Sequence, residues 1–242
     1  MHTHQDPHFS RAPLPGHLNG SDWTQQMADI HDRTGYWNSY YSNDPLIRQQ
    51  PPSQFAAFVA AECAGFPLIV DVGCGNGRDT LFFAQLGHQT LGIDKSSAAI
   101  DQSAQKVLDR ANAQDHAFLC MNALSLPDAS DLVERLSSKK KVIYSRFFLH
   151  AITQEEQTAF LDFSFACMQA DDMLALEFRT REDASREKVT GSHYRRYIDA
   201  EALADQLVQD YPGALEYFTT GTGLAKFRSD DAHVARILVR KV

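Results

Sequence analysis

After Pro67 the chain alternates short apolar runs with amphipathic stretches, and this alternation constrains the fold more than any other feature. The apolar runs have the length of strands, and they read LIVDV, QTLGI, AFLCM, KVIYSR, MLALEF, ALEYFT and HVARILVR. The predicted helices between them are 80–86, 96–111, 153–168 and 200–211. Because such alternation produces a parallel sheet covered on both faces, we predict an α/β fold with a Rossmann-like, seven-stranded, mostly parallel sheet.

Only the turn-like segment GTGLAKFRSDD separates the last two predicted strands. A parallel pair would need a long crossover, so we expect the last strand to be antiparallel. Thr153 and Glu156 have the spacing of a capping box at the start of the 153–168 helix. Gly87 is placed to end the 80–86 helix.

The chain is expected to have three parts. Residues 1–20, rich in His and Pro, predict a flexible tail. Residues 21–66 predict an N-terminal helical lid, in which Ser53 caps a helix that Gly65 ends, and residues 67–242 form the main domain. The lid is rich in aromatic residues, namely Trp23, Tyr36, Trp37, Tyr40 and Tyr41.

Charge and composition exclude several classes of protein. The 242 residues include 23 basic and 31 acidic ones, a net charge of −8 that disfavours a nucleic-acid partner. No apolar run of about 18 residues and no signal peptide are found, so we expect a cytoplasmic protein without a membrane partner. The scattered cysteines indicate small buried residues rather than disulfides or a metal site, and they are Cys63, Cys74, Cys120 and Cys167.

A glycine loop follows the first strand in the segment IVDVGCGNGRDT. Gly73, Gly75 and Gly77 allow positive φ angles and let a ligand lie against bare backbone at the start of a helix. Their G-x-G-x-G spacing differs from the G-x-G-x-x-G of dinucleotide-binding proteins. Asp71 precedes the loop, and Asp94 ends the next strand, where a carboxylate can accept hydrogen bonds from both hydroxyls of a ribose.

In these motifs the sequence resembles the class I S-adenosylmethionine-dependent methyltransferases. The matching pieces are VDVGCGNGRD, Asp94, MNAL after the third strand and YSRFFLHAI after the fourth, and the resemblance covers about 67–242. It implies S-adenosylmethionine as the cofactor, with Asp94 on the ribose, Asn122 and Lys95 near the adenine and Arg48 on the methionine carboxylate. The implied cofactor-binding residues are Asp71, Gly73, Cys74, Gly75, Gly77, Asp94, Lys95, Asn122, Ala123, Leu124, Ser145, Arg48 and Tyr36.

Methyl transfer from a sulfonium requires positioning and, for a protonated nucleophile, a base. His150 is a candidate base just after the fourth strand, although a structural role for it is equally open. The other candidate catalytic residues are Tyr194, which could position or activate a hydroxyl, and Arg146. The residues expected to bind substrate are Trp37 and, from the basic segments that follow the fifth strand, Arg179, His193 and Arg195. Arg196 is expected to gather at the same end of the sheet, whereas 181–188 is expected to be solvated.

We therefore expect a methyltransferase acting on the oxygen or nitrogen of a polar or anionic small molecule. One alternative keeps the cofactor but not the methyl transfer, for example cyclisation of its aminobutyrate arm with release of methylthioadenosine. A non-catalytic cofactor-binding subunit is a second alternative, and a nicotinamide dehydrogenase is disfavoured by the glycine spacing. The acceptor and the oligomeric state stay open.

Overall fold

The computed structural model describes residues 33–42, 51–108, 115–122, 126–186, 188, 193–227 and 229–242. The predicted tail at 1–20 lies outside the described residues, as do 21–32 and 43–50 of the predicted lid. In the described part of the lid, residues 33–42 are helical. No helix among the described residues is long and apolar enough to cross a membrane.

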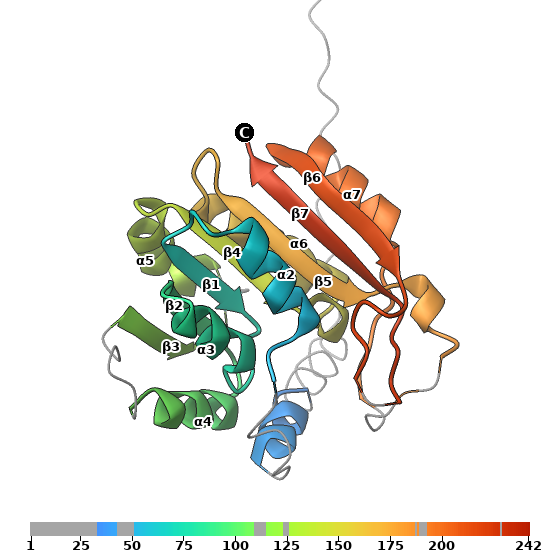
Figure 1. Cartoon of the computed structure of the whole chain (residues 1–242), viewed down its shortest axis with the longest axis horizontal. Coiled ribbons are helices and arrows are strands. Elements are labelled where there is room, and N and C mark those ends of the chain that lie inside the picture. The colour runs from blue at the N-terminus through green and yellow to red at the C-terminus, as the bar shows by residue number, and fades with distance from the viewer. Residues whose placement is uncertain are drawn as a thin grey trace, which may run out of the picture. The chain divides into compact units, whose positions relative to one another are not determined.

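The strands form one seven-stranded sheet in the order β3-β2-β1-β4-β5-β7-β6 (Figure 1). They are β1 (Leu68–Val72), β2 (Gln89–Asp94), β3 (His116–Cys120), β4 (Lys141–Arg146), β5 (Met173–Arg179), β6 (Gly213–Gly221) and β7 (Val234–Lys241). The pairs from β3 to β5 are parallel, and β7 runs antiparallel to both β5 and β6. The predicted fold class, including its antiparallel last strand, is confirmed.

Helices cover both faces of this sheet (Figure 1). They are α2 (Gln54–Glu62), α3 (Arg78–Gln85), α4 (Ser97–Leu108), α5 (Leu126–Ser137), α6 (Gln154–Cys167) and α7 (Ala200–Gln209), with short 3-10 turns η3 (Leu149–Ala151) and η4 (Arg181–Asp183). The sequence patterns predict no helix between the third and fourth strands, but the structure has helix α5 there. Pro127 is tolerated there because the first helical turn does not need its N–H.

Helix starts follow their capping residues. Ser53 accepts the N–H of Ala56 at the start of α2, and the predicted capping box of Thr153 and Glu156 opens α6. Helix α3 begins at Arg78, two residues earlier than predicted, because Gly77 adopts a left-handed conformation with φ 75° and serves as its N-cap. Helix α2 ends at Glu62, before the predicted stop at Gly65.

Alternate residues of the strands feed two apolar cores. In β1, Val70 packs with α5, α6 and α7 on one face, whereas Ile69 packs with α2 and α3 on the other. Helix α2, expected in the lid, buries Phe55 and Val59 in this second core. It therefore forms part of the layer that supports the sheet.

Three of the four cysteines are buried as predicted, whereas Cys120 is exposed. The prediction for Cys120 is wrong because β3 is an edge strand and this cysteine is its last residue. From β1 the chain builds β2 and then β3 on one side, and the connection after β3 crosses back to place β4 on the other side of β1. In open α/β sheets such a switch point creates a crevice at the carboxyl ends of the strands, which is where the candidate site lies.

Candidate functional site

A cavity of about 480 Å³ lies at the carboxyl ends of the parallel strands. Each of the strands β1, β2, β3, β4 and β5 contributes to its lining with its last residue or with the residue that follows it. Thirteen sequence-predicted site residues line it, which are Tyr36, Trp37, Asp71, Gly73, Cys74, Asp94, Lys95, Asn122, Arg146, His150, Arg179, His193 and Arg195. The fold thus brings together residues that are up to 159 positions apart in the chain, from Tyr36 to Arg195.

The glycine loop turns tightly between β1 and α3. Gly73 has φ 76°, and a Cβ there would lie 2.6 Å from the Phe148 ring. Gly75 has φ 54°, and a Cβ there would collide with the Tyr41 hydroxyl. Gly75 and Gly77, also predicted to bind the cofactor, are not among the residues that line the cavity. Only glycine meets both the backbone and the space requirement at these positions.

Asp71 lies at the base of the loop with its side chain buried. It accepts a 2.6 Å hydrogen bond from the Thr80 hydroxyl, which ties β1 to α3. Burial raises the pKa of Asp71 to about 7, against the opposing effect of the Thr80 hydrogen bond. The residue therefore orders the loop and is partly protonated near neutral pH.

Asp94 ends β2 at the cavity wall and joins two backbone segments. One carboxylate oxygen accepts the Gly75 N–H at 2.9 Å, and the other accepts the Ser96 N–H at 2.8 Å. Burial raises the pKa of Asp94, and these hydrogen bonds oppose the rise. A carboxylate has about four lone-pair positions, so these two hydrogen bonds do not saturate it and capacity remains to accept from a ligand hydroxyl.

The predicted adenine side of the site is only partly described. Lys95 and Asn122 line the cavity, and burial lowers the pKa of the Lys95 ammonium. Met121 also lines the cavity beside Asn122 and was not predicted. The predicted residues Ala123, Leu124 and Arg48 lie outside the described residues.

Aromatic residues of the helical segment 33–42 cover part of the cavity. Tyr36 and Trp37 line it as expected, and so do Tyr40 and Tyr41. The Tyr36 hydroxyl lies 3.1 Å from Nδ1 of His193, and the two rings stack at 4.8 Å.

The same segment is attached at its start by an ion pair. Arg33 binds Glu156, the capping-box residue of α6, at 2.6 Å. The segment thus contacts both the 193–196 stretch and the start of α6.

His150 lies in η3, lines the cavity and is buried. The backbone N–H of Arg179 donates to its Nδ1 at 3.3 Å. Burial lowers the pKa of His150 well below its usual value, and the nearby charge of Arg179 lowers it further. A neutral imidazole whose Nδ1 accepts a hydrogen bond carries its proton on Nε2, so this geometry makes His150 a donor and a poor base.

Besides Gly75 and Gly77, two predicted site residues among those described are not brought into the cavity lining, Tyr194 and Ser145. Tyr194 is 44% exposed and does not line the cavity. The guanidinium carbon of Arg33 lies over its ring, 5.2 Å from the ring centroid. Ser145 is buried and donates to the Val72 carbonyl at 2.9 Å, which joins β4 to β1 beneath the cavity. Arg196, also expected at this end of the sheet, donates to Gln157 and to backbone carbonyls and is absent from the lining.

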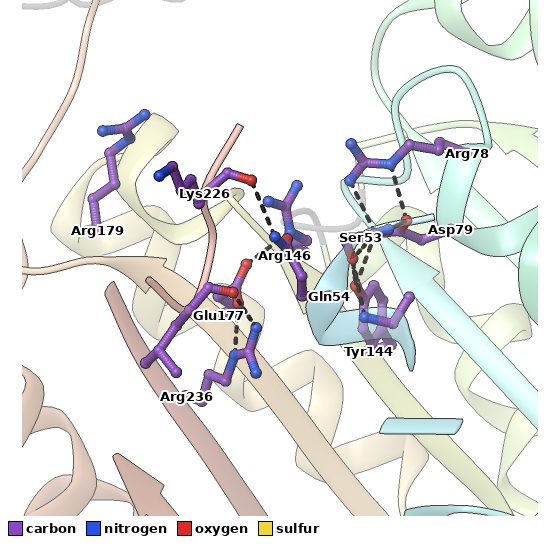
Figure 2. Close-up of polar contacts among 12 residues, drawn as sticks. Ser53, Gln54, Arg78, Asp79, Tyr144, Arg146, Glu177, Arg179, Lys226 and Arg236 are labelled. Carbon is purple, nitrogen blue, oxygen red and sulfur yellow. Dashed lines mark hydrogen bonds and ion pairs between the residues drawn. The ribbon is translucent and has the colours of Figure 1, made fainter. Parts of the chain in front are cut away.

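Sequence reasoning missed a buried cluster around Asp79 (Figure 2). Asp79 accepts hydrogen bonds from Ser53 at 2.8 Å, Tyr144 at 2.9 Å and Arg78 at 2.9 Å. Burial opposes ionisation of Asp79, yet Arg78 and Arg146 hold its pKa well below the usual range. Its only sequence signal is an acid in the first turn after the glycine loop, because Ser53 and Tyr144 are distant in the chain.

A second missed set lies near the β6–β7 connection. Gln54 of α2 donates to the Lys226 carbonyl at 3.0 Å, and both residues line the cavity (Figure 2). Asp230 of the same connection accepts from Arg179 at 2.7 Å. Loops of this kind carry no periodic pattern, so nothing in the sequence assigns them to the site.

Residues 69–171 match a family model described as a methyltransferase domain. No curated protein matches the chain in sequence. Among solved structures, an S-adenosylmethionine-dependent methyltransferase from Anabaena variabilis is similar with a TM-score of 0.64 at 16% identity, covering 93% of this chain and 96% of that one.

Two further structures share the fold. The glycopeptide N-methyltransferase MtfA, complexed with S-adenosylmethionine, has a TM-score of 0.60 at 10% identity and covers 79% of this chain and 95% of its own. The 4+2 cyclase SpnF has a TM-score of 0.63 at 15% identity, with coverage of 90% and 96%. At these identities the likeness establishes the fold alone.

Proposed function

Because residues 69–171 match a methyltransferase domain and the fold is shared with S-adenosylmethionine-dependent methyltransferases, we propose that this chain is a class I enzyme of that kind and methylates an oxygen or nitrogen atom of a small polar or anionic acceptor. When bound, S-adenosylmethionine supplies an electrophilic methyl group on a sulfonium. The residues of the cavity bind and orient the two reactants and exclude water.

The observation that carries this proposal is the Asp94 carboxylate, fixed by the Gly75 and Ser96 N–H groups beside the Gly73 backbone that lines the cavity. Its remaining lone pairs suit the two hydroxyls of a ribose. Gly73 and Cys74 bring bare backbone to the cavity, next to which the methionine part would lie. We assign Asn122 and Lys95 to the adenine side, and Arg48, Ala123 and Leu124 remain part of the same assignment.

Aromatic residues support the binding of a cation. Tyr36, Trp37 and Tyr40 line the cavity and contact one another edge-on or stacked. The face of an aromatic ring attracts a positive charge by about 0.5–2 kcal/mol per good contact. We propose that these rings favour a sulfonium and limit the entry of water.

Basic residues of the lining support an anionic acceptor. Six basic residues line the cavity against four acidic ones, in a chain whose net charge is −8; the basic ones are Arg78, Lys95, Arg146, Arg179, Arg195 and Lys226, and the acidic ones are Asp71, Asp79, Asp94 and Asp230. A locally positive cavity attracts small anions in spite of the negative total. We propose that the acceptor is a small molecule and that no nucleic acid or membrane takes part.

The geometry of His150 favours an acceptor that needs no strong base. Its Nδ1 is occupied by the Arg179 N–H, so His150 can donate a hydrogen bond to the acceptor but does not accept its proton. An amine that is unprotonated at the working pH, or an oxygen anion, fits this arrangement. Tyr194, which is exposed outside the cavity, has no part in this version of the chemistry.

A second candidate keeps the cofactor and uses it without methyl transfer. It is favoured by the hydrogen bond that keeps His150 from acting as a base and by the cyclase that shares the fold. The two are separated by incubating the chain with S-adenosylmethionine, first alone and then with small carboxylic acids, amines and sugars, and analysing products by mass spectrometry.

The proposal predicts S-adenosylhomocysteine only when an acceptor is present, and no such product from an Asp94→Ala variant. Methylthioadenosine formed without an acceptor would instead establish the second candidate. If S-adenosylmethionine fails to bind in calorimetry, neither function holds.

A further inference from the structure

Two arginines share one carboxylate at the ends of β4, β5 and β7 (Figure 2). Arg146 Nε donates to Oε1 of Glu177 at 2.7 Å, and Arg236 Nε donates to Oε2 at 2.8 Å. Glu177 is only 1% exposed, so water does not screen these contacts. Two guanidinium groups against one carboxylate leave this cluster with one uncompensated positive charge.

The neighbouring arginine at the end of β5 is neutralised differently. Arg179 donates to Asp183 and to Asp230, each at 2.7 Å, and Lys188 also contacts Asp183 at 3.0 Å. Two cations and two carboxylates balance each other there. At the ends of β4 and β5 the net positive charge is therefore concentrated in the cluster that contains Arg146.

The guanidinium of Arg146 keeps its outer edge for a ligand. Nε makes its hydrogen bond to Glu177, whereas neither terminal nitrogen bonds to a described residue. Figure 2 shows these two nitrogens pointing away from Glu177. Two parallel N–H groups in one plane match the two oxygens of a carboxylate, a geometry that lysine cannot reproduce.

Phe147 holds this guanidinium from one side. The guanidinium carbon of Arg146 lies 4.0 Å from the Phe147 ring centroid. Phe147 itself has φ 56°, a conformation that costs free energy for a residue with a side chain and that is found at functional sites. Glu177 reinforces the arrangement, because its backbone carbonyl accepts the Phe147 N–H at 2.8 Å.

Strand β1 separates the Arg146 guanidinium from the proposed ribose site at Asp94. Asp94 ends β2 and Arg146 ends β4, on opposite sides of β1. Neighbouring strands are about 4.8 Å apart, so the two strand ends are roughly 10 Å apart across the sheet. A small acceptor bound at Arg146 would thus lie beside the cofactor and not in its place.

We propose that Arg146 binds a carboxylate of the acceptor and that Glu177 is the positioning residue that orients its guanidinium. This inference rests on the proposed function, since it assumes that the acceptor occupies the same cavity. One net positive charge and a planar pair of donors fit a monoanionic carboxylate better than a dianionic phosphate. The carboxylate is a handle that is bound and not methylated, because two hydrogen bonds to a cation reduce its nucleophilicity.

Calorimetric titration of the full chain, saturated with S-adenosylhomocysteine, tests the proposal. The probes are benzoate, its neutral analogue benzamide and inorganic phosphate. Benzoate should bind more tightly than benzamide or phosphate. Arg146→Lys should weaken benzoate binding more than tenfold, because lysine lacks the planar pair of N–H donors. Arg181→Lys is the matched control, because Arg181 is 67% exposed and pairs with Asp199 outside the cavity.

Glu177→Gln adds a readout that a purely structural role would not give. The substitution raises the net charge of the cluster by one, so phosphate should bind more tightly relative to benzoate than it does in the unmodified chain. An unchanged ratio would remove the positioning role of Glu177.

Three results would overturn the carboxylate assignment: no benzoate binding, equal benzoate binding by Arg146→Lys, or tighter binding of phosphate than benzoate by the unmodified chain. Binding of S-adenosylhomocysteine is measured in every variant. If S-adenosylhomocysteine binds but benzoate does not, only this inference fails. If the unmodified chain does not bind S-adenosylhomocysteine, the proposed function fails as well.

Discussion

Asp94 accepts the backbone N–H of Gly75 at 2.9 Å, and this hydrogen bond joins the end of β2 to the glycine loop that follows β1. Tyr41 packs against Gly75 from the helical segment 33–42, so three separate parts of the chain meet at this one glycine. The carboxylate proposed to bind the ribose is therefore oriented by the protein before any ligand arrives. Such preorganisation reduces the ordering cost of binding.

The first prediction concerns the protonation of His150. Burial and the charge of Arg179 lower its pKa, so we expect a neutral ring with its proton on Nε2 at neutral pH and no titration near pH 6.5. Nitrogen chemical shifts of the histidine side chains, assigned by comparison with a His150→Gln variant, would measure this. A ring that titrates near pH 6.5 would contradict the structure and return His150 to the candidate bases.

Asp71 is expected to make stability depend on pH. Its pKa rises from 3.8 to about 7 on folding, so between these values the folded chain holds a proton that the unfolded chain has lost. Its contribution to the free energy of unfolding is therefore largest at acidic pH and is lost as the pH rises to about 7, at up to about 1.4 kcal/mol per pH unit.

The Asp71→Asn variant should lose this dependence while its amide oxygen still accepts the Thr80 hydroxyl. Urea unfolding from pH 5 to 8 would show a smaller decline in stability than in the unmodified chain. Asp101→Asn, at an exposed position of α4, serves as the control and should keep the original slope. Parallel slopes for Asp71→Asn and the unmodified chain would show that Asp71 is ionised throughout.

A buried ion pair at the opposite end of β4 should be important for stability. Asp172 accepts the Lys141 ammonium and N–H and also the Gln169 N–H, and Lys141 is fully buried. Asp172→Ala leaves an uncompensated buried charge and should lower the free energy of unfolding by about 3–5 kcal/mol. Adding Lys141→Met should recover part of the loss, while the exposed Asp205→Ala should change stability by less than about 0.5 kcal/mol.

Trp37 should report cofactor binding. The chain has two tryptophans, so a Trp23→Phe variant leaves Trp37 as the single emitter. Because Trp37 lines the cavity, S-adenosylhomocysteine should change its emission, with a midpoint equal to the calorimetric dissociation constant. Calorimetric binding with unchanged emission would place the cofactor away from the helical segment 33–42.

Much of the fold follows from patterns that a sequence displays directly. Asp94 and the glycine loop could be placed because strand, loop and helix signals are contiguous and a parallel sheet brings strand ends together. Helix α5 was missed although Leu132 and Leu136 have helical spacing and pack in the core, because Pro127 and the polar residues around it resemble a loop.

The parts of the site that depend on distant contacts could not be predicted. Ser53, Asp79 and Tyr144 come from a cap, a helix and a strand, and nothing local in the chain pairs them. Tyr194 shows the opposite error, since an aromatic residue beside basic ones suggested a site although its side chain is 44% exposed and does not line the cavity. Charge balance is equally hidden, because Arg146 and Arg179 look alike until their carboxylate partners are known.

The role of Asp94 is tested most directly by calorimetry with S-adenosylhomocysteine and its 2′-deoxyribose analogue. Asp94→Ala should weaken binding of S-adenosylhomocysteine more than tenfold, with a folded state verified by circular dichroism. Removal of the ribose hydroxyl should weaken binding strongly in the unmodified chain and much less in Asp94→Ala, because the hydroxyl has lost its partner. Equal affinities for S-adenosylhomocysteine in the two proteins, or the same loss on removing the hydroxyl from both, would contradict the account.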